Sequence, residues 1–166
     1  MQKGSFQPIS LAAAYDSIYA ITVPSVVLDT NVFVAALRSD GGASRRVVKL
    51  ALTRRIEPIF GNALWLEYQE MLSRDVWGTQ TTLEQRLEVM AALASVSRWV
   101  RMSFRWRPNL ADEDDNHLIE LAVAGGATAV VTHNLRDVEV GELKFDDLLV
   151  MTPGAFLARF FRESAQ

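Results

Sequence analysis

Four acidic residues follow predicted strands or lie in the helices after them, and their placement is the strongest sign of chemistry in the sequence. Asp29 directly follows the apolar run Val26–Leu28, which is typical of a strand buried on both faces. In open α/β sheets, ligands bind beyond the carboxyl ends of the strands. Acids at several such positions can therefore meet although they are far apart in the sequence. The four are Asp29, Glu67, Asp115 and Asp137.

Carboxylates that meet in one place repel each other, so at neutral pH either some of them bind protons or a cation neutralises them. The chain contains no cysteine, which leaves oxygen atoms as the main candidate ligands. Such ligands favour a hard cation, Mg²⁺ or Mn²⁺, over zinc. We therefore expect one or two of these ions at the acid cluster.

Two of these acids, Asp29 and Asp115, also have a purely structural interpretation. Asp29 or Thr30 could cap the helix that follows the first strand. Asp112 and Asp115 fit the N-cap and N3 positions of a helix start, where the helix dipole favours negative charge. The acids can therefore serve as caps, as ligands or as both.

Glu67 is harder to explain as a surface residue. A glutamate on a helix is exposed in most proteins. The run from 64 to 68, however, is Leu-Trp-Leu-Glu-Tyr, in which Glu67 is the one charged residue. We therefore expect Glu67 to be shielded from solvent and Glu70, one turn further on, to be the solvated acid of this helix.

Apolar runs of strand length alternate with stretches of helical periodicity, which predicts a largely parallel sheet covered by helices on both faces. One helix is expected to begin at a Ser44 N-cap and to end near Thr53. Another is capped by Thr81 or Thr82, runs to Ser95, and is expected to bury Leu83, Leu87, Met90, Ala91 and Ala94. Strands are expected at 25–29, 57–60, 99–102, 127–132 and 148–151, and the other helices at 32–37, 63–73, 112–125 and 155–161.

Size and composition indicate one globular domain. The chain has 166 residues, of which 49% are hydrophobic and 22% charged, enough to bury a sizeable core. We assign residues 25–166 to this domain and residues 1–24 to an N-terminal extension. No apolar run approaches the roughly 18 residues of a membrane span, and the first residues do not resemble a signal peptide. Together with the lack of cysteine, this predicts a cytoplasmic protein.

The overall charge argues against a protein that holds nucleic acid mainly through a basic surface. The formal net charge is −3 and the isoelectric point is near 5.4, whereas such domains are strongly positive. A local cluster, Arg45, Arg46 and Lys49, could still bind RNA phosphates. The alternative is that these residues form the solvated face of a helix.

Four short motifs, taken in order, resemble those of the PIN-domain family, the PilT N-terminus-like nucleases that include the VapC-type toxins of toxin–antitoxin pairs. The resemblance covers roughly residues 26 to 161. Each motif is weak alone, but the four in this order are specific. They are Leu-Asp-Thr-Asn-Val at 28–32, Glu-Tyr-x-x-x-Leu at 67–72, Asp-x-x-Asp-Asn-x-x-Ile-x-x-Ala at 112–122, and Gly-Gly-Ala-x-x-Val-Val-Thr-x-Asn-x-x-Asp at 125–137.

The resemblance implies a three-layer α/β/α fold with a mainly parallel sheet of about five strands, and metal-dependent cleavage of RNA. It implies a protein antitoxin as a partner and a homodimer, for which Trp65 and Trp77 are candidate interface residues. The sequence departs from the family pattern at Asn134, where many members have an acid, and in the segment before residue 26. The implied catalytic and metal-binding residues are Asp29, Glu67, Asp115 and Asp137, supported by Thr30, Asn31, Asp112 and Asn134.

The resulting hypothesis is hydrolysis of RNA phosphodiester bonds by water, leaving a 5′-phosphate and a 3′-hydroxyl, with Glu67 as a ligand or a base. His133 is expected beside the site and His117 on the surface of its helix. Two other interpretations remain open. The fold could be a non-catalytic RNA- or protein-binding module whose acids cap helices or hold a structural ion. It could also be a phosphoryl-transfer domain, although Asn31 stands where that class has a second aspartate.

Overall fold

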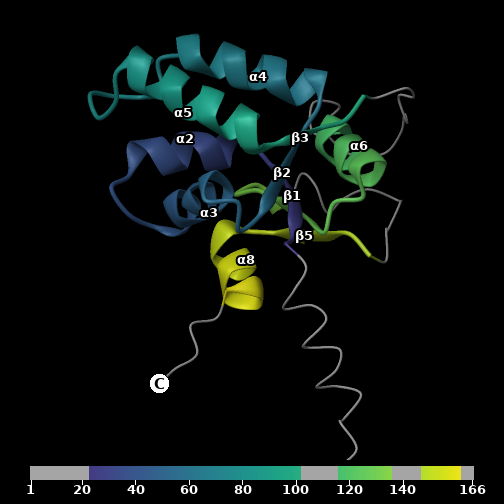
Figure 1. The fold of residues 1–166 in the computed structure, drawn as a ribbon. Coiled ribbons are helices and arrows are strands. Elements are labelled where there is room, and N and C mark those ends of the chain that lie inside the picture. Colours follow the sequence, from purple (N-terminus) through teal and green to yellow (C-terminus); the bar gives the residue numbers. More distant parts are fainter. Residues whose placement is uncertain (1–22, 102–115, 136–146, 162–166) are drawn as a thin grey trace, which may run out of the picture.

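The computed structural model describes residues 23–101, 116–135 and 147–161. They form a sheet of five strands in the order β3-β2-β1-β4-β5, and every neighbouring pair is parallel. This doubly wound order places β1 at the centre of the sheet (Figure 1). The strands are β1 (Ser25–Leu28), β2 (Glu57–Phe60), β3 (Arg98–Trp99), β4 (Ala129–Val131) and β5 (Leu149–Met151).

Six helices lie among the described residues and cover both faces of the sheet. Figure 1 shows α2, α3 and α5 on one side of the strands and α6 on the other. Helix α8 packs against α3 and β5. The predicted three-layer α/β/α architecture is thus confirmed. The helices are α2 (Thr30–Arg38), α3 (Ala43–Leu52), α4 (Asn62–Ser73), α5 (Leu83–Val96), α6 (Asn116–Gly125) and α8 (Pro153–Phe160).

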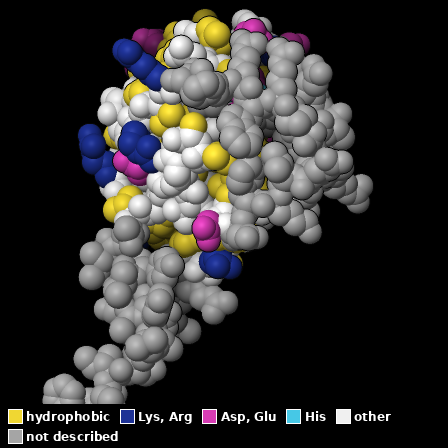
Figure 2. Space-filling model, turned by 90° about the vertical axis from the view of Figure 1, so that its right-hand side faces the viewer, with side chains coloured by type: hydrophobic (Ala, Val, Ile, Leu, Met, Phe, Trp, Pro, Cys, Tyr) yellow, Lys and Arg dark blue, Asp and Glu magenta, His cyan; other side chains and the backbone are white. Residues whose placement is uncertain are grey.

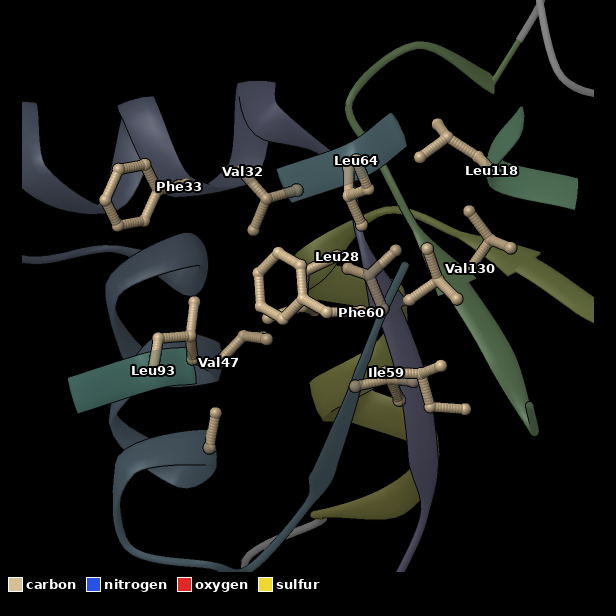
Figure 3. Close-up of a cluster of buried hydrophobic side chains, with 14 of the residues drawn as sticks. Leu28, Val32, Phe33, Val47, Ile59, Phe60, Leu64, Leu93, Leu118 and Val130 are labelled. Carbon is tan, nitrogen blue, oxygen red and sulfur yellow. The ribbon is translucent and has the colours of Figure 1, made fainter. Parts of the chain in front are cut away.

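The core lies between the sheet and its helices. Val26 and Val27 of β1 are completely buried, as expected for the central strand of a parallel sheet. Their branched side chains suit this position because they pack well on a pleated surface. Figure 3 shows side chains from β1, β2 and β4 and from several helices meeting in one cluster, among them Leu28, Ile59, Phe60, Val130, Val47, Leu93 and Leu118.

Two details of the secondary structure, one of a helix and one of a strand, differ from the sequence prediction. The N-cap of α3 is Gly42, with φ +94°, and Ser44 is buried inside the first turn, where its hydroxyl contacts His133. Ser44 is therefore not the cap. The predicted third strand, 99–102, is also observed one residue earlier as Arg98–Trp99, paired with β2.

The buried face of α5 was also predicted wrongly. Met90 is buried as expected, but Leu83 and Leu87 are 53% and 49% exposed, and Leu93 is the residue that is fully buried. Both faces of α5 carry apolar residues, so periodicity alone could not choose between them. The observed rotation buries Leu93 in the core and places the guanidinium of Arg86 4.7 Å from the ring centre of the buried Trp77, where it also donates to the backbone of Thr81.

This orientation of α5 can be tested by truncating one leucine on each face. Leu93→Ala should lower the free energy of unfolding by about 2–5 kcal/mol, because it leaves a cavity in the core. Leu87→Ala should lower it by less than about 1 kcal/mol, because that side chain is half exposed. Urea unfolding of the two variants measures both values, and a larger loss for Leu87→Ala would contradict the observed orientation.

Candidate active site

Asp29 occupies the point where the central strand ends. It follows β1 directly and is the N-cap of α2, whose second residue, Asn31, donates its backbone N–H to Asp29 Oδ1 at 3.3 Å. The side chain is 6% exposed. The positive end of the helix dipole faces the cap and stabilises a carboxylate there. Capping is thus performed by Asp29 itself, one of the two residues considered for it.

A set of hydrogen-bond donors surrounds the Asp29 carboxylate. Oδ2 accepts hydrogen bonds from Asn31 Nδ2 at 2.7 Å and from Thr132 Oγ1 at 2.6 Å. No Lys, Arg or His side chain in the described part of the chain forms an ion pair with it. A buried carboxylate is costly unless it is paired or binds a cation, and these neutral donors meet only part of that cost.

Asn31 and Thr132 join the ends of β1 and β4. The parallel register pairs Leu28 with Val131, so that the next residues, Asp29 and Thr132, lie beside each other. Asn31 reaches across this gap: its Nδ2 also lies 3.2 Å from Thr132 Oγ1, and its Oδ1 accepts the backbone N–H of His133. These bonds fix the Asp29 carboxylate relative to the sheet edge.

Thr30 holds Glu67 of α4 next to Asp29. We call the group formed at the ends of β1 and β4 by Asp29, Thr30, Asn31, Glu67 and Thr132 the corner. The Thr30 hydroxyl donates to Glu67 Oε1 at 2.7 Å and lies 3.2 Å from Asp29 Oδ1. The other Glu67 oxygen, Oε2, lies 2.8 Å from His117 Nε2. Burial alone would raise the pKa of Glu67, but the close contact and charge of His117 and the hydrogen bond from Thr30 outweigh it, and the pKa lies below its ordinary value of 4.5.

Tyr68, the residue after Glu67, holds the end of β1 in place through a buried hydrogen bond. Its side chain is fully buried and its hydroxyl donates to the carbonyl oxygen of Leu28 at 2.9 Å, one residue before Asp29. Burial raises the pKa of Tyr68 well above 10.0, and the charges of Asp29 and Glu67 raise it further. Tyr68 is therefore a permanent donor at neutral pH.

The structure brings together part of the predicted site. Asp29, Glu67, Thr30 and Asn31 meet as described, and the backbone N–H of Asn134 donates to Thr132 Oγ1 at 2.9 Å. Glu70 is exposed and pairs with Arg74, as predicted for the solvated acid. The remaining predicted acids, Asp112, Asp115 and Asp137, lie outside the described residues.

The three cations predicted to bind RNA have different surroundings. Arg45 is half-buried, and its guanidinium donates to the carbonyl oxygens of Ser39 at 3.0 Å and Ala36 at 3.4 Å, near the end of α2. Arg46 and Lys49 are exposed on α3. Trp77, a predicted interface residue, is only 2% exposed and belongs to the core, so it cannot serve at a surface.

Sequence reasoning gave no role to Thr132 and misplaced His117. Thr132 could have been found from the parallel register, because it follows β4 as Asp29 follows β1. His117 is not on an open surface: its side chain is 23% exposed and meets Glu67. It stands four residues before the buried Leu121, at the edge of the buried stripe of α6. This spacing in the sequence could have predicted that His117 is partly buried.

The donor set fits a hard divalent cation. Asp29 and Glu67 offer carboxylate oxygens, the preferred ligands of Mg²⁺ and Mn²⁺. Asp29 is buried without an ion pair from the described residues, which is the situation that a bound cation would relieve. No group of three or more His, Asp or Glu side chains comes together within residues 23–101, 116–135 and 147–161. Two of the four predicted ligands fall outside these ranges.

Comparison with known proteins establishes the family. Residues 25–136, more than half of the chain, match the family model described as the PIN domain. The chain therefore belongs to the PIN-domain family, as its motifs predicted. No curated protein sequence gives a significant match.

Among solved structures, the chain is similar to one in the crystal structure of VapBC2 from Rickettsia felis bound to a DNA fragment from their promoter. The identity is 14%, the TM-score is 0.50, and the match covers 76% of this chain and 96% of the other. At this identity the likeness shows a shared fold.

Thr132→Val should reveal how strongly the corner depends on the Thr132 hydroxyl. Valine has nearly the same shape but takes a donor from Asp29 and an acceptor from the backbone N–H of Asn134, so the free energy of unfolding should fall by about 1–3 kcal/mol. Thr128→Val, at the other end of β4, is the matched control and should change it by less than about 0.5 kcal/mol. Equal losses in urea unfolding would contradict the assigned role.

Tyr68 should make stability fall at alkaline pH. Its pKa is raised in the folded state, so the stabilisation is complete below about pH 10, where the unfolded tyrosine ionises, and is lost as the pH rises above it. Tyr68→Phe removes this dependence and costs about 1 kcal/mol at neutral pH. Between about pH 8 and 11, the free energy of unfolding should decline more steeply for the parent than for Tyr68→Phe. Parallel curves for the two proteins would contradict the prediction.

Proposed function

We propose that this PIN-domain protein is a metal-dependent endoribonuclease that hydrolyses RNA phosphodiester bonds. One observation carries the proposal: the Asp29 carboxylate is buried at the end of the central strand, surrounded by neutral donors, and joined through the Thr30 hydroxyl to a second carboxylate, Glu67. A module that used these acids only as caps would need Asp29 but would give no reason for Glu67 to be there.

Asp29, Glu67, Asp115 and Asp137 would hold one or two Mg²⁺ or Mn²⁺ ions. Oδ2 of Asp29 accepts two short hydrogen bonds, whereas the two partners of Oδ1, the Asn31 backbone N–H and the Thr30 hydroxyl, lie at 3.3 Å and 3.2 Å, so Oδ1 is the oxygen better able to bind a cation. A divalent cation bound there would lower the pKa of the attacking water and neutralise charge on the phosphate oxygens.

The protein groups have separate duties in this mechanism. Glu67 stays ionised because its pKa is low, which suits a ligand better than a base that must take up a proton at neutral pH. Thr30 and Asn31 orient the two carboxylates, and Tyr68 holds the end of β1 in place. Attack by water on phosphorus would leave a 5′-phosphate and a 3′-hydroxyl.

RNA would be held by local rather than overall positive charge. Arg46 lines a hollow of about 550 Å³ between α3 and α8, and Ser44 on the same turn of α3 contacts His133, next to Thr132. Arg46 and Lys49 are therefore the cations proposed to contact phosphates, while Arg45 mainly anchors α2. On the face shown in Figure 2, Lys and Arg side chains of the described residues lie in separate spots rather than in a continuous stripe.

The biological setting proposed is that of a toxin with a protein antitoxin as its partner. The similar solved structure is that of VapBC2 bound to a DNA fragment from their promoter, which supports this assignment for a protein of the same fold. The cytoplasmic location and the homodimer remain parts of the proposal. No helix among the described residues could span a membrane.

RNA cleavage in Mg²⁺ or Mn²⁺ tests the nuclease. The parent should cleave single-stranded and structured RNA, and chelation with EDTA should abolish the activity. Asp29→Asn should lower the rate by more than about 100-fold, because it removes the charge that faces the cation and puts an amide N–H₂ among donors. Glu67→Gln, Asp115→Asn and Asp137→Asn should also be severely impaired.

Two exposed acids provide matched controls. Glu70→Gln changes the same residue type one turn along α4, and Asp40→Asn changes an exposed aspartate after α2. Both should keep the parent rate within about twofold. A parent that leaves RNA intact, or an Asp29→Asn variant as active as the controls, would overturn the nuclease assignment.

A further inference from the structure

His117 and Glu67 form a contact between two helices of different crossovers. His117 is the second residue of α6, and Glu67 lies in the middle of α4. Nε2 of the histidine is 2.8 Å from Oε2 of the glutamate, and both atoms are buried. The side chains are 23% and 34% exposed, so solvent competes only weakly for this contact.

The two oxygens of Glu67 are fixed from opposite sides. Thr30 of α2 donates to Oε1 at 2.7 Å, and His117 of α6 meets Oε2 at 2.8 Å. A free glutamate side chain samples many rotamers, and holding it in one of them costs conformational entropy. With both oxygens engaged, the carboxylate is already ordered beside Asp29 before any ligand binds, which favours a ligand that needs this arrangement.

We propose that His117 is a positioning residue of the metal site, acting through Glu67. This inference rests on the proposed function and goes beyond it, because the proposed set of site residues gives no role to His117. Histidine at this position holds Oε2, so that Oε1 remains beside Thr30 and Asp29. In the sequence, Asp115 directly precedes α6, so the same contact also sets the start of α6 relative to Glu67.

The test is a double-mutant cycle read out as the dissociation constant for Mn²⁺, measured by calorimetry on the full chain without RNA. The four proteins are the parent, His117→Phe, Glu67→Gln and the double variant. His117→Phe should weaken Mn²⁺ binding by about 10–100-fold, the usual effect of removing a residue that orients a ligand. In the Glu67→Gln background the same substitution should change the constant by less than about twofold, because the group it acts through is gone.

Two further variants separate positioning from a general loss of structure. His117→Gln keeps a donor that can face Oε2, so it should bind Mn²⁺ more tightly than His117→Phe. Val123→Ala, at an exposed position of α6, should bind like the parent. Far-ultraviolet circular dichroism confirms that each variant is folded before its constant is compared.

The outcomes distinguish this inference from the proposed function. Unchanged Mn²⁺ binding in His117→Phe overturns the inference, and so does an equal loss in the Glu67→Gln background, which would mean that His117 acts independently. A parent that binds Mn²⁺ but cleaves no RNA overturns the nuclease and leaves the His117 comparison valid. A parent that binds no Mn²⁺ overturns both.

Discussion

The burial of one carboxylate at the end of the central strand is the constraint on which the rest of the corner depends. Asp29 gains two short hydrogen bonds, from Asn31 and Thr132, and the cap of a helix. The bond from Asn31 and the helix cap are local to residues 29–31, whereas the bond from Thr132 requires β1 and β4 to end in the observed register. The sheet topology therefore determines the local chemistry, since a slip of one residue along either strand would separate Asp29 from Thr132.

The same constraint explains why the corner suits a cation. Neutral donors orient a carboxylate without cancelling its charge, and among the described residues Glu67 has a contact with His117, whereas Asp29 has no ion-pair contact with a Lys, Arg or His side chain. The site thus has an ordered half, in which Glu67 is held at both oxygens, and a charged half, in which Asp29 keeps acceptor capacity on Oδ1. In an acidic chain of net charge −3, such a site attracts small cations more readily than a large polyanion, so the proposed binding of RNA would depend on local cations such as Arg46.

Much of the fold could be predicted because it follows from local patterns. The buried runs at Val26 and Ala129 specify central strands, and alternation with helices specifies a parallel sheet. The rotation of α5 could not be predicted, because both of its faces are apolar and the orientation depends on packing in the folded protein, which buries Leu93 and places Arg86 over Trp77. In the site, Asp29 and Glu67 were identified from their own neighbourhoods, whereas His117 was misplaced because its partner is 50 residues away and only packing brings them together.

The most direct test of a metal-binding Asp29 is a crystal structure of the full chain grown with MnCl₂, with an anomalous difference map collected near the manganese edge. The prediction is a peak within about 2–2.5 Å of Asp29 Oδ1, with Glu67 beside it and Thr132 still donating to Oδ2. A well-phased map with manganese peaks elsewhere or nowhere, and Asp29 surrounded only by its protein donors, would contradict the central claim.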